Sequence, residues 1–174
     1  MEIELLKNLI AKNPEEKLNE IIPEAILNIP NNKKDTISFI FWFCYMVETE
    51  LNDVLTNSWK KVIRESESET QEASIKIIKE NVFKDSDKDI DNLEYFKDKI
   101  KLYIFAKGEN SFSKFLWIVN GIRNDLSHNR VDSLKYKEKN LFLKETKAEL
   151  LIDYFSLMKD NEFTLKGSFK NILQ

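Results

Sequence analysis

The chain has 174 residues, of which 42% are hydrophobic, with three glycines, three prolines and a net charge of −3. This length and hydrophobic content suit one domain with a buried core and exclude a disordered chain. The scarcity of turn residues argues against sandwiches and barrels and predicts an all-α fold, while the acidic balance excludes nonspecific wrapping of duplex nucleic acid.

Two helical segments are expected at the start of the chain, over residues 1–12 and 15–28. Asn13 and Pro14 form a helix start signal, and Pro23 should kink or divide the second segment. The N-terminus opens with acidic residues and lacks the basic region and long apolar region of a secretory signal. We therefore expect a cytoplasmic protein.

A long helix is predicted from about Asp35 to Arg64 because apolar residues recur there at intervals of three and four. The apolar run within it, residues 39–47, is far shorter than the ~20 residues that span a bilayer, so we expect a buried helix and no membrane contact. Cys44 is the single cysteine and should be a small buried side chain in a reducing compartment. The expected stripe comprises Phe39, Phe43, Met46, Val47, Leu51, Val54 and Leu55.

The next segment, residues 65–98, carries eleven acidic and five basic residues. An apolar face returns over residues 75–83, and "KDSDKDIDN" should break the helix. Its carboxylates resemble a calcium loop but lack the glycine turn, so a solvated acidic face is the preferred interpretation. One histidine and one cysteine cannot supply a zinc site, and we expect no metal and no cofactor.

Three further helices are expected in the second half of the chain. The first should run from Asp89 to Ala106 with Gly108 as its C-cap, and the second should open near Asn110 or Ser111. A polar stretch to about Lys144 should precede the third helix, "ETKAELLIDYFSLM". These elements predict an N-terminal extension over residues 1–34, a helical domain over 35–160 and a tail over 161–174, together forming one globular unit.

The motif "RNDLSH", Arg123 to His128, contains the only histidine of the chain. RNA cleavage by internal attack needs a group that moves protons near neutral pH and a permanent cation that stabilises charge on the phosphate. His128 and Arg123 can fill these roles. Arg123 also offers bidentate phosphate recognition, and Asn124 adds an amide that can orient a partner or substrate.

Helix geometry separates these residues within one chain. On a straight helix Arg123 and His128 lie roughly 140° apart, whereas Asn124 and His128 share a face. A break in the helix or a second subunit must bring the set together. Taken alone, an arginine and a histidine at this spacing also fit a helix end whose histidine caps or packs.

The segment "IRNDLSHNR", after an apolar helix in an all-helical chain, resembles the HEPN superfamily, whose signature is an arginine, a polar residue and a histidine after four to six positions. Arg123, Asn124 and His128 match this signature. The upstream "FWFCYMVETELNDVL" is similar to an early family helix that carries a glutamate. Glu50 matches that glutamate best and Glu48 is the alternative.

The resemblance implies a bundle of four to five helices that dimerises, with two copies of the motif in one cleft. It also implies a metal-independent endoribonuclease that serves as a toxin or in antiviral defence, with an antitoxin or defence protein as its partner. Glu50 would then pair with Arg123 or orient His128. Some toxin members carry a tyrosine two positions after the histidine, where this chain has Arg130, so modification by their partner enzyme is not expected.

The chain is locally basic after the motif. Between His128 and Lys147, six basic residues outnumber three acidic ones. Tyr136 and Phe142 among them are candidates for stacking on unpaired bases, although inward-packing aromatics fit the same pattern. The candidate RNA-binding residues are Arg130, Lys135, Tyr136 and Lys137.

Three functions follow from these patterns. The first is a ribonuclease of the HEPN type that acts on single-stranded RNA, the second is a non-catalytic RNA-binding or dimerisation module, and the third is an unrelated helical protein that binds a small ligand or partner. Metal-independent cleavage of unstructured RNA separates the first from the others. RNA binding without cleavage selects the second.

Overall fold

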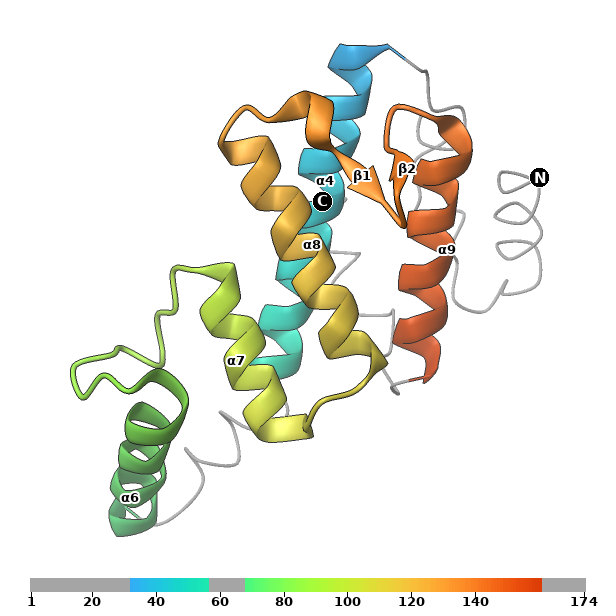
Figure 1. Ribbon diagram of the computed structural model, residues 1–174. Coiled ribbons are helices and arrows are strands. Elements are labelled where there is room, and N and C mark those ends of the chain that lie inside the picture. The colour runs from blue at the N-terminus through green and yellow to red at the C-terminus, as the bar shows by residue number, and fades with distance from the viewer. Residues whose placement is uncertain (1–31, 57–67, 161–174) are drawn as a thin grey trace. The chain divides into compact units, whose positions relative to one another are not determined.

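The computed structural model describes residues 32–56 and 68–160 (Figure 1). The helices expected over residues 1–28, the end of the long helix after residue 56, and the C-terminal tail lie outside these ranges. The chain divides into two compact units: the first joins residues up to Met46 with those from Ile118 onward, and the second spans Val47–Trp117. The predicted domain boundaries and the single globular unit stay predictions.

The described residues are mostly helical, which confirms the all-α prediction. They form the α-helices α4 (Lys33–Leu55), α6 (Ser68–Ile78), α7 (Phe96–Lys107), α8 (Ser111–Ser127) and α9 (Lys144–Asp160), with a short hairpin between the last two. Helices α4 and α8 each run from one unit into the other. None of the described helices is both long enough and apolar enough to cross a membrane.

Helix α4 confirms the clearest periodic pattern of the sequence. Asn32 caps its N-terminus, where the Asn32 side-chain oxygen accepts the Asp35 backbone N–H at 2.9 Å. Six of the seven predicted stripe residues are buried and Val54 is half-buried, and Cys44 is buried as expected. This face supplies much of the core because each of these side chains leaves water on folding.

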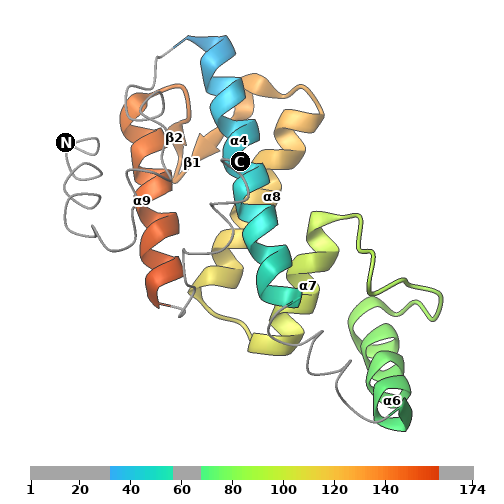
Figure 2. The ribbon, with the colours of Figure 1, turned by 180° about the vertical axis from the view of Figure 1, so that it is seen from behind.

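The first unit is built around the N-terminal half of α4. In both views this part of α4 lies between the second half of α8 and helix α9 (Figure 1, Figure 2). Phe43 on α4 meets Tyr154 on α9 edge to face, with ring centroids 5.6 Å apart. Both side chains are fully buried, so this contact joins α4 and α9.

The second unit contains α6, a π-helical turn η3 (Lys79–Phe83), α7 and the start of α8. The chain breaks after residue 83, as predicted, but α7 begins at Phe96 and not at Asp89. The Asp89 carboxylate accepts the backbone N–H groups of Asp91 at 3.0 Å and Asn92 at 3.3 Å. These local bonds hold the backbone in turns, and therefore the predicted start of this helix was wrong.

The junction between α7 and α8 follows the sequence signals closely. Gly108 ends α7 with φ +80°, a conformation that favours glycine, and its N–H donates to the Ile104 carbonyl at 2.8 Å. Asn110 and Ser113 then form a reciprocal capping box. Each side-chain oxygen accepts the backbone N–H of the other residue, at 2.9 and 3.0 Å. The start of the motif helix is thereby fixed.

The polar stretch after the motif contains structure that the sequence did not predict. A 3₁₀ turn η4 (Val131–Ser133) leads into strands β1 (Lys135–Tyr136) and β2 (Lys139–Asn140), which pair antiparallel. The two turn residues, Lys137 and Glu138, have φ of 47° and 63°. Hairpin turns of this kind favour asparagine and glycine, and this chain has neither there.

Candidate functional site

The motif "RNDLSH" lies at the C-terminal end of α8, where the helix stops in a Schellman turn. Asn129 adopts a left-handed conformation with φ 56°, and its N–H donates to the Leu126 carbonyl at 3.1 Å. The Arg130 N–H donates to the Asp125 carbonyl at 2.8 Å. His128 is consequently the last residue before the chain turns away, and its side chain is exposed.

The three motif residues lie within the last turns of one helix. Asn124 is exposed and Arg123 is half-exposed. The His128 N–H donates to the Asn124 carbonyl at 3.0 Å, so these two residues are one turn apart on the same face. Helical geometry continues to His128, and the turn therefore does not bring Arg123 onto that face.

The Schellman turn gives a testable role to Asn129. A residue with a Cβ in the left-handed region costs about 1 kcal/mol, and asparagine tolerates it better than alanine does. We expect Asn129→Ala to lower the free energy of unfolding by about 1 kcal/mol and Asn129→Gly to leave it unchanged or raise it slightly. Urea unfolding of both variants checks this, and equal stability of the two would contradict the role of the turn.

Arg130 folds back along the end of α8. Its Nε lies 3.4 Å from the Asp125 carboxylate, and 58% of its side chain remains exposed. The pair therefore holds Arg130 one residue past the turn without burying the guanidinium. Because arginine offers five donors, the Asp125 contact leaves donor capacity for an anion beside His128.

The hairpin changes the interpretation of the other predicted RNA-binding residues. Tyr136 is 3% exposed, and its hydroxyl donates to Asp153 of α9 at 2.6 Å. Burial and this hydrogen bond raise the pKa of Tyr136 above its usual range. Its ring packs inward, which is the alternative that the sequence left open for the aromatic residues of this segment. Phe142 is half-buried.

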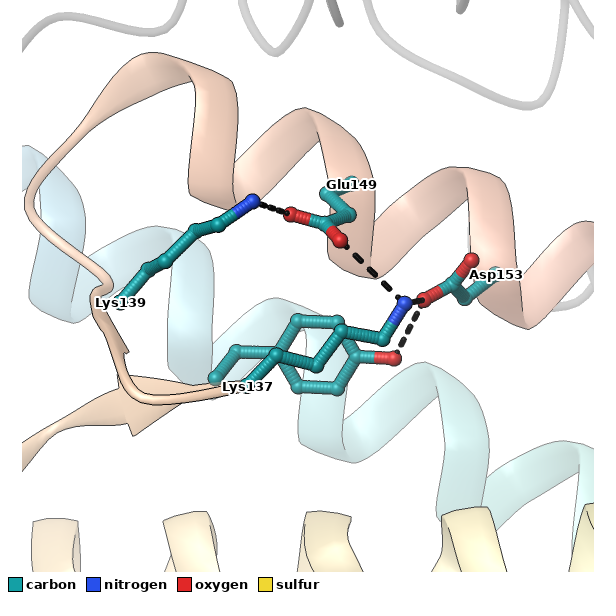
Figure 3. Close-up of polar contacts among 5 residues, drawn as sticks. Lys137, Lys139, Glu149 and Asp153 are labelled. Carbon is teal, nitrogen blue, oxygen red and sulfur yellow. Dashed lines mark hydrogen bonds and ion pairs between the residues drawn. The ribbon is translucent and has the colours of Figure 1, made fainter.

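Lys137 belongs to a cluster of ion pairs that ties the hairpin to α9 (Figure 3). Its ammonium lies 2.6 Å from Asp153 and 3.2 Å from Glu149, and Lys139 lies 2.8 Å from Glu149. The hydrogen bond to Asp153 raises the pKa of Lys137, and the bond from Lys139 lowers the pKa of Glu149. Lys137 is therefore engaged within the fold.

The ion pairs weaken the basic patch that the sequence predicted. The segment from His128 to Lys147 has a net charge of +3. Glu149 and Asp153 follow this segment in the sequence, and including them lowers the net charge to +1. Sequence spacing gives no signal for these contacts because they join residues 10 to 16 positions apart. Lys135 is exposed and makes no ion pair with any residue that the structure describes.

Glu50 is a buried acid in the second unit, whereas the motif belongs to the first, so its predicted contact with Arg123 or His128 stays a prediction. It is 3% exposed, and its Oε2 finds no hydrogen-bond donor among the described residues. Desolvation, aided by the nearby Asp53 charge, raises the pKa of Glu50 to about 7. The alternative, Glu48, pairs with Lys99 at 2.5 Å.

No group of three or more histidine, cysteine, aspartate or glutamate side chains within residues 32–56 and 68–160 is arranged to hold a metal ion. Comparisons with known proteins returned no match to any family model, to any curated protein or to any solved structure.

Proposed function

We propose that this chain is an endoribonuclease of the HEPN type that cleaves single-stranded RNA without a metal. The observation that carries the proposal is the end of α8, where Arg123, Asn124 and His128 occupy the last turns and His128 is exposed at the point where the helix stops. An imidazole, a guanidinium and an amide beside solvent supply proton transfer, charge stabilisation and orientation.

The proposed reaction is an internal transfer on the RNA strand. The His128 imidazole takes the proton of a ribose 2′-hydroxyl, whose oxygen attacks the adjacent phosphorus. The bond from phosphorus to the 5′-oxygen breaks, and a histidine in the acid form returns a proton to that oxygen. Arg123 neutralises the nonbridging oxygens, and Asn124 orients the imidazole or the phosphate. The products are a 2′,3′-cyclic phosphate and a 5′-hydroxyl.

The reaction is best served by a homodimer. One chain supplies one histidine, and helix geometry places Arg123 away from the face shared by Asn124 and His128. In a homodimer, the second copy of α8 supplies a second His128 and an Arg123 that can face the first motif. The same face carries Trp117, which is 40% exposed, and the exposed Gly121. An apolar side chain and a glycine on one helix face permit a close approach of two helices.

Gly121 offers a test of the dimer. Glycine within a helix costs about 1 kcal/mol relative to alanine, and a Cβ at this position would meet no atom within 4 Å. We therefore expect Gly121→Ala to raise the stability of the isolated chain, and Gly121→Leu to dissociate the dimer and abolish cleavage without unfolding the chain. Light scattering and circular dichroism check both. A Gly121→Leu protein that stays dimeric would exclude this face.

The experiment for the activity compares an RNA strand with a DNA strand of the same sequence. Labelled single strands are incubated with the purified chain, and the termini of the products are analysed. We expect cleavage of RNA to a 2′,3′-cyclic phosphate and resistance of DNA, which has no 2′-hydroxyl. Cleavage of both strands, or 3′-hydroxyl products, would contradict the proposal.

A non-catalytic RNA-binding module is the second candidate. The roughly 140° between Arg123 and His128 favours it if the chain is monomeric, because one chain then cannot assemble the groups on one phosphate. In either case we propose a role in a toxin–antitoxin or antiviral defence system, with an antitoxin or defence protein as partner. The resemblance of the motif to the HEPN signature supports this role.

A further inference from the structure

Two aromatic side chains on helix α4 are far more exposed than their chemistry favours. Phe41 is 60% exposed and Tyr45 is 61% exposed, the highest values among the large hydrophobic side chains that the structure describes. They are four positions apart and so lie on one helix face. Scattered single apolar residues need no explanation, but two adjacent rings form a patch.

The side chains next to Phe41 and Tyr45 on α4 show that the two rings lie on a different side of the helix from the core. Trp42 is half-buried and lies against the buried Phe39, with ring centroids 6.1 Å apart, so it belongs to the packed side of α4. Phe41 and Tyr45 lie on the other side, in line with Ser38 and Lys34 toward the start of the helix. This face is therefore a strip with two rings at one end and a cation at the other.

The charge at the start of the strip indicates the ligand. Lys33 and Lys34 are exposed and form no ion pair with a described residue. The Asp35 carboxylate already accepts a hydrogen bond from the Asn32 side-chain amide, and the Asp35 backbone N–H donates to the Asn32 side-chain oxygen. Two lysines at the positive end of a helix dipole favour an anionic group, and exposed aromatic rings beside them favour flat bases.

We propose that Phe41 and Tyr45 form a stacking platform for two bases of a single-stranded RNA, with Lys33 and Lys34 holding its phosphates. This inference rests on the proposed function, whose RNA it helps to bind. The backbone positions of the two residues are about 6 Å apart along the helix axis, farther than the ~3.4 Å between bases in a duplex strand. The platform therefore selects extended, unpaired RNA and is tolerant of sequence.

The position of the platform suits this role. Figure 1 and Figure 2 both show the N-terminal half of α4 beside the second half of α8, whose end carries the motif, and both segments belong to the first unit. The platform thus replaces Tyr136, whose ring is buried, as the source of aromatic contacts to the bases.

The test measures binding in a chain that carries His128→Ala, so that cleavage does not consume the RNA. A fluorescein-labelled 12-nucleotide oligouridine is titrated with this protein and with the same protein carrying Phe41→Ala and Tyr45→Ala. Each lost stacking contact should weaken binding by about tenfold or more. Phe105→Ala, which removes a 48% exposed ring from α7, is the matched control and should leave the affinity unchanged.

Two further double variants test whether RNA binding depends specifically on the two rings and on the two lysine charges. Phe41→Tyr with Tyr45→Phe retains both rings and should restore binding. Lys33→Gln with Lys34→Gln should weaken binding and reduce its dependence on salt concentration, since each phosphate contact to a single strand adds about 0.7 to the salt slope.

The outcomes separate this inference from the proposed function. Cleavage by the unmodified chain with unchanged RNA affinity in the Phe41→Ala, Tyr45→Ala protein would overturn the platform alone. Binding that needs both rings, without any cleavage, would support the platform and overturn the nuclease. A double variant that becomes monomeric where the parent is dimeric would assign the face to a second copy of the chain. Absence of RNA binding by the parent would overturn both.

Discussion

Replacing His128 by alanine is expected to lower the rate of RNA cleavage by two to four orders of magnitude, the usual contribution of a positioned acid or base. Arg123→Ala should cost two to three orders of magnitude because it removes the charge that stabilises the phosphate. The His128 side chain is exposed and that of Arg123 half-exposed. His128→Ala should therefore shift the free energy of unfolding by no more than about 0.5 kcal/mol.

Two comparisons make this result specific. Arg123→Lys keeps the charge but loses the planar pair of donors, so it should recover only part of the activity. Ser127→Ala alters an exposed neighbour whose hydroxyl bonds the Arg123 carbonyl at 2.9 Å, and it should retain full activity. Undiminished cleavage by the His128→Ala protein would exclude His128 as the proton-transfer group.

Glu50→Gln is expected to stabilise the protein above neutral pH. Burial raises the pKa of Glu50 from 4.5 to about 7, so the folded state holds its proton more tightly than the unfolded state does. Stability should therefore fall as pH rises from about 4.5 to about 7 and level off above that. Glutamine stays neutral, so the variant should gain about 3 kcal/mol at pH 8 and nothing at pH 4.

Urea unfolding of both proteins between pH 4 and pH 8 measures this effect. Glu48→Gln is the matched control on the same helix, and it should have the opposite sign at neutral pH because it leaves the mostly buried Lys99 ammonium without its partner. Equal stability of the Glu50→Gln and unmodified proteins at pH 8 would contradict the buried, unpaired state of Glu50. Loss of cleavage in the stabilised Glu50→Gln protein would support its predicted place in the site.

The elements that the sequence predicted are those whose signals are local. The apolar period of α4 and the glycine after α7 act within a few residues, and both were confirmed. The start of α7 was predicted too early because Ile90 and Leu93 continue the helical period and are buried in a loop. The apolar period indicates which residues are buried. The backbone conformation here is set by the hydrogen bonds that the Asp89 carboxylate accepts from the following backbone N–H groups.

The hairpin could not be predicted because long-range contacts determine it. Lys137 and Glu138 carry no turn signal, and the left-handed backbone there coincides with contacts from Tyr136 and Lys137 to Asp153 on α9. In the candidate site, a helix end beside His128 was one interpretation that the sequence allowed, whereas the Schellman turn at Asn129 is seen only in the structure. The inward packing of Tyr136 was one of two alternatives that the sequence left open.

Cleavage of single-stranded RNA in the presence of EDTA tests the central claim most directly. The purified chain and its His128→Ala variant are incubated with the same labelled RNA, with and without the chelator. We predict that the unmodified chain cleaves equally in both conditions and leaves 2′,3′-cyclic phosphate ends, while the variant is inactive. Activity that disappears with EDTA, or that persists in the His128→Ala protein, would contradict the account.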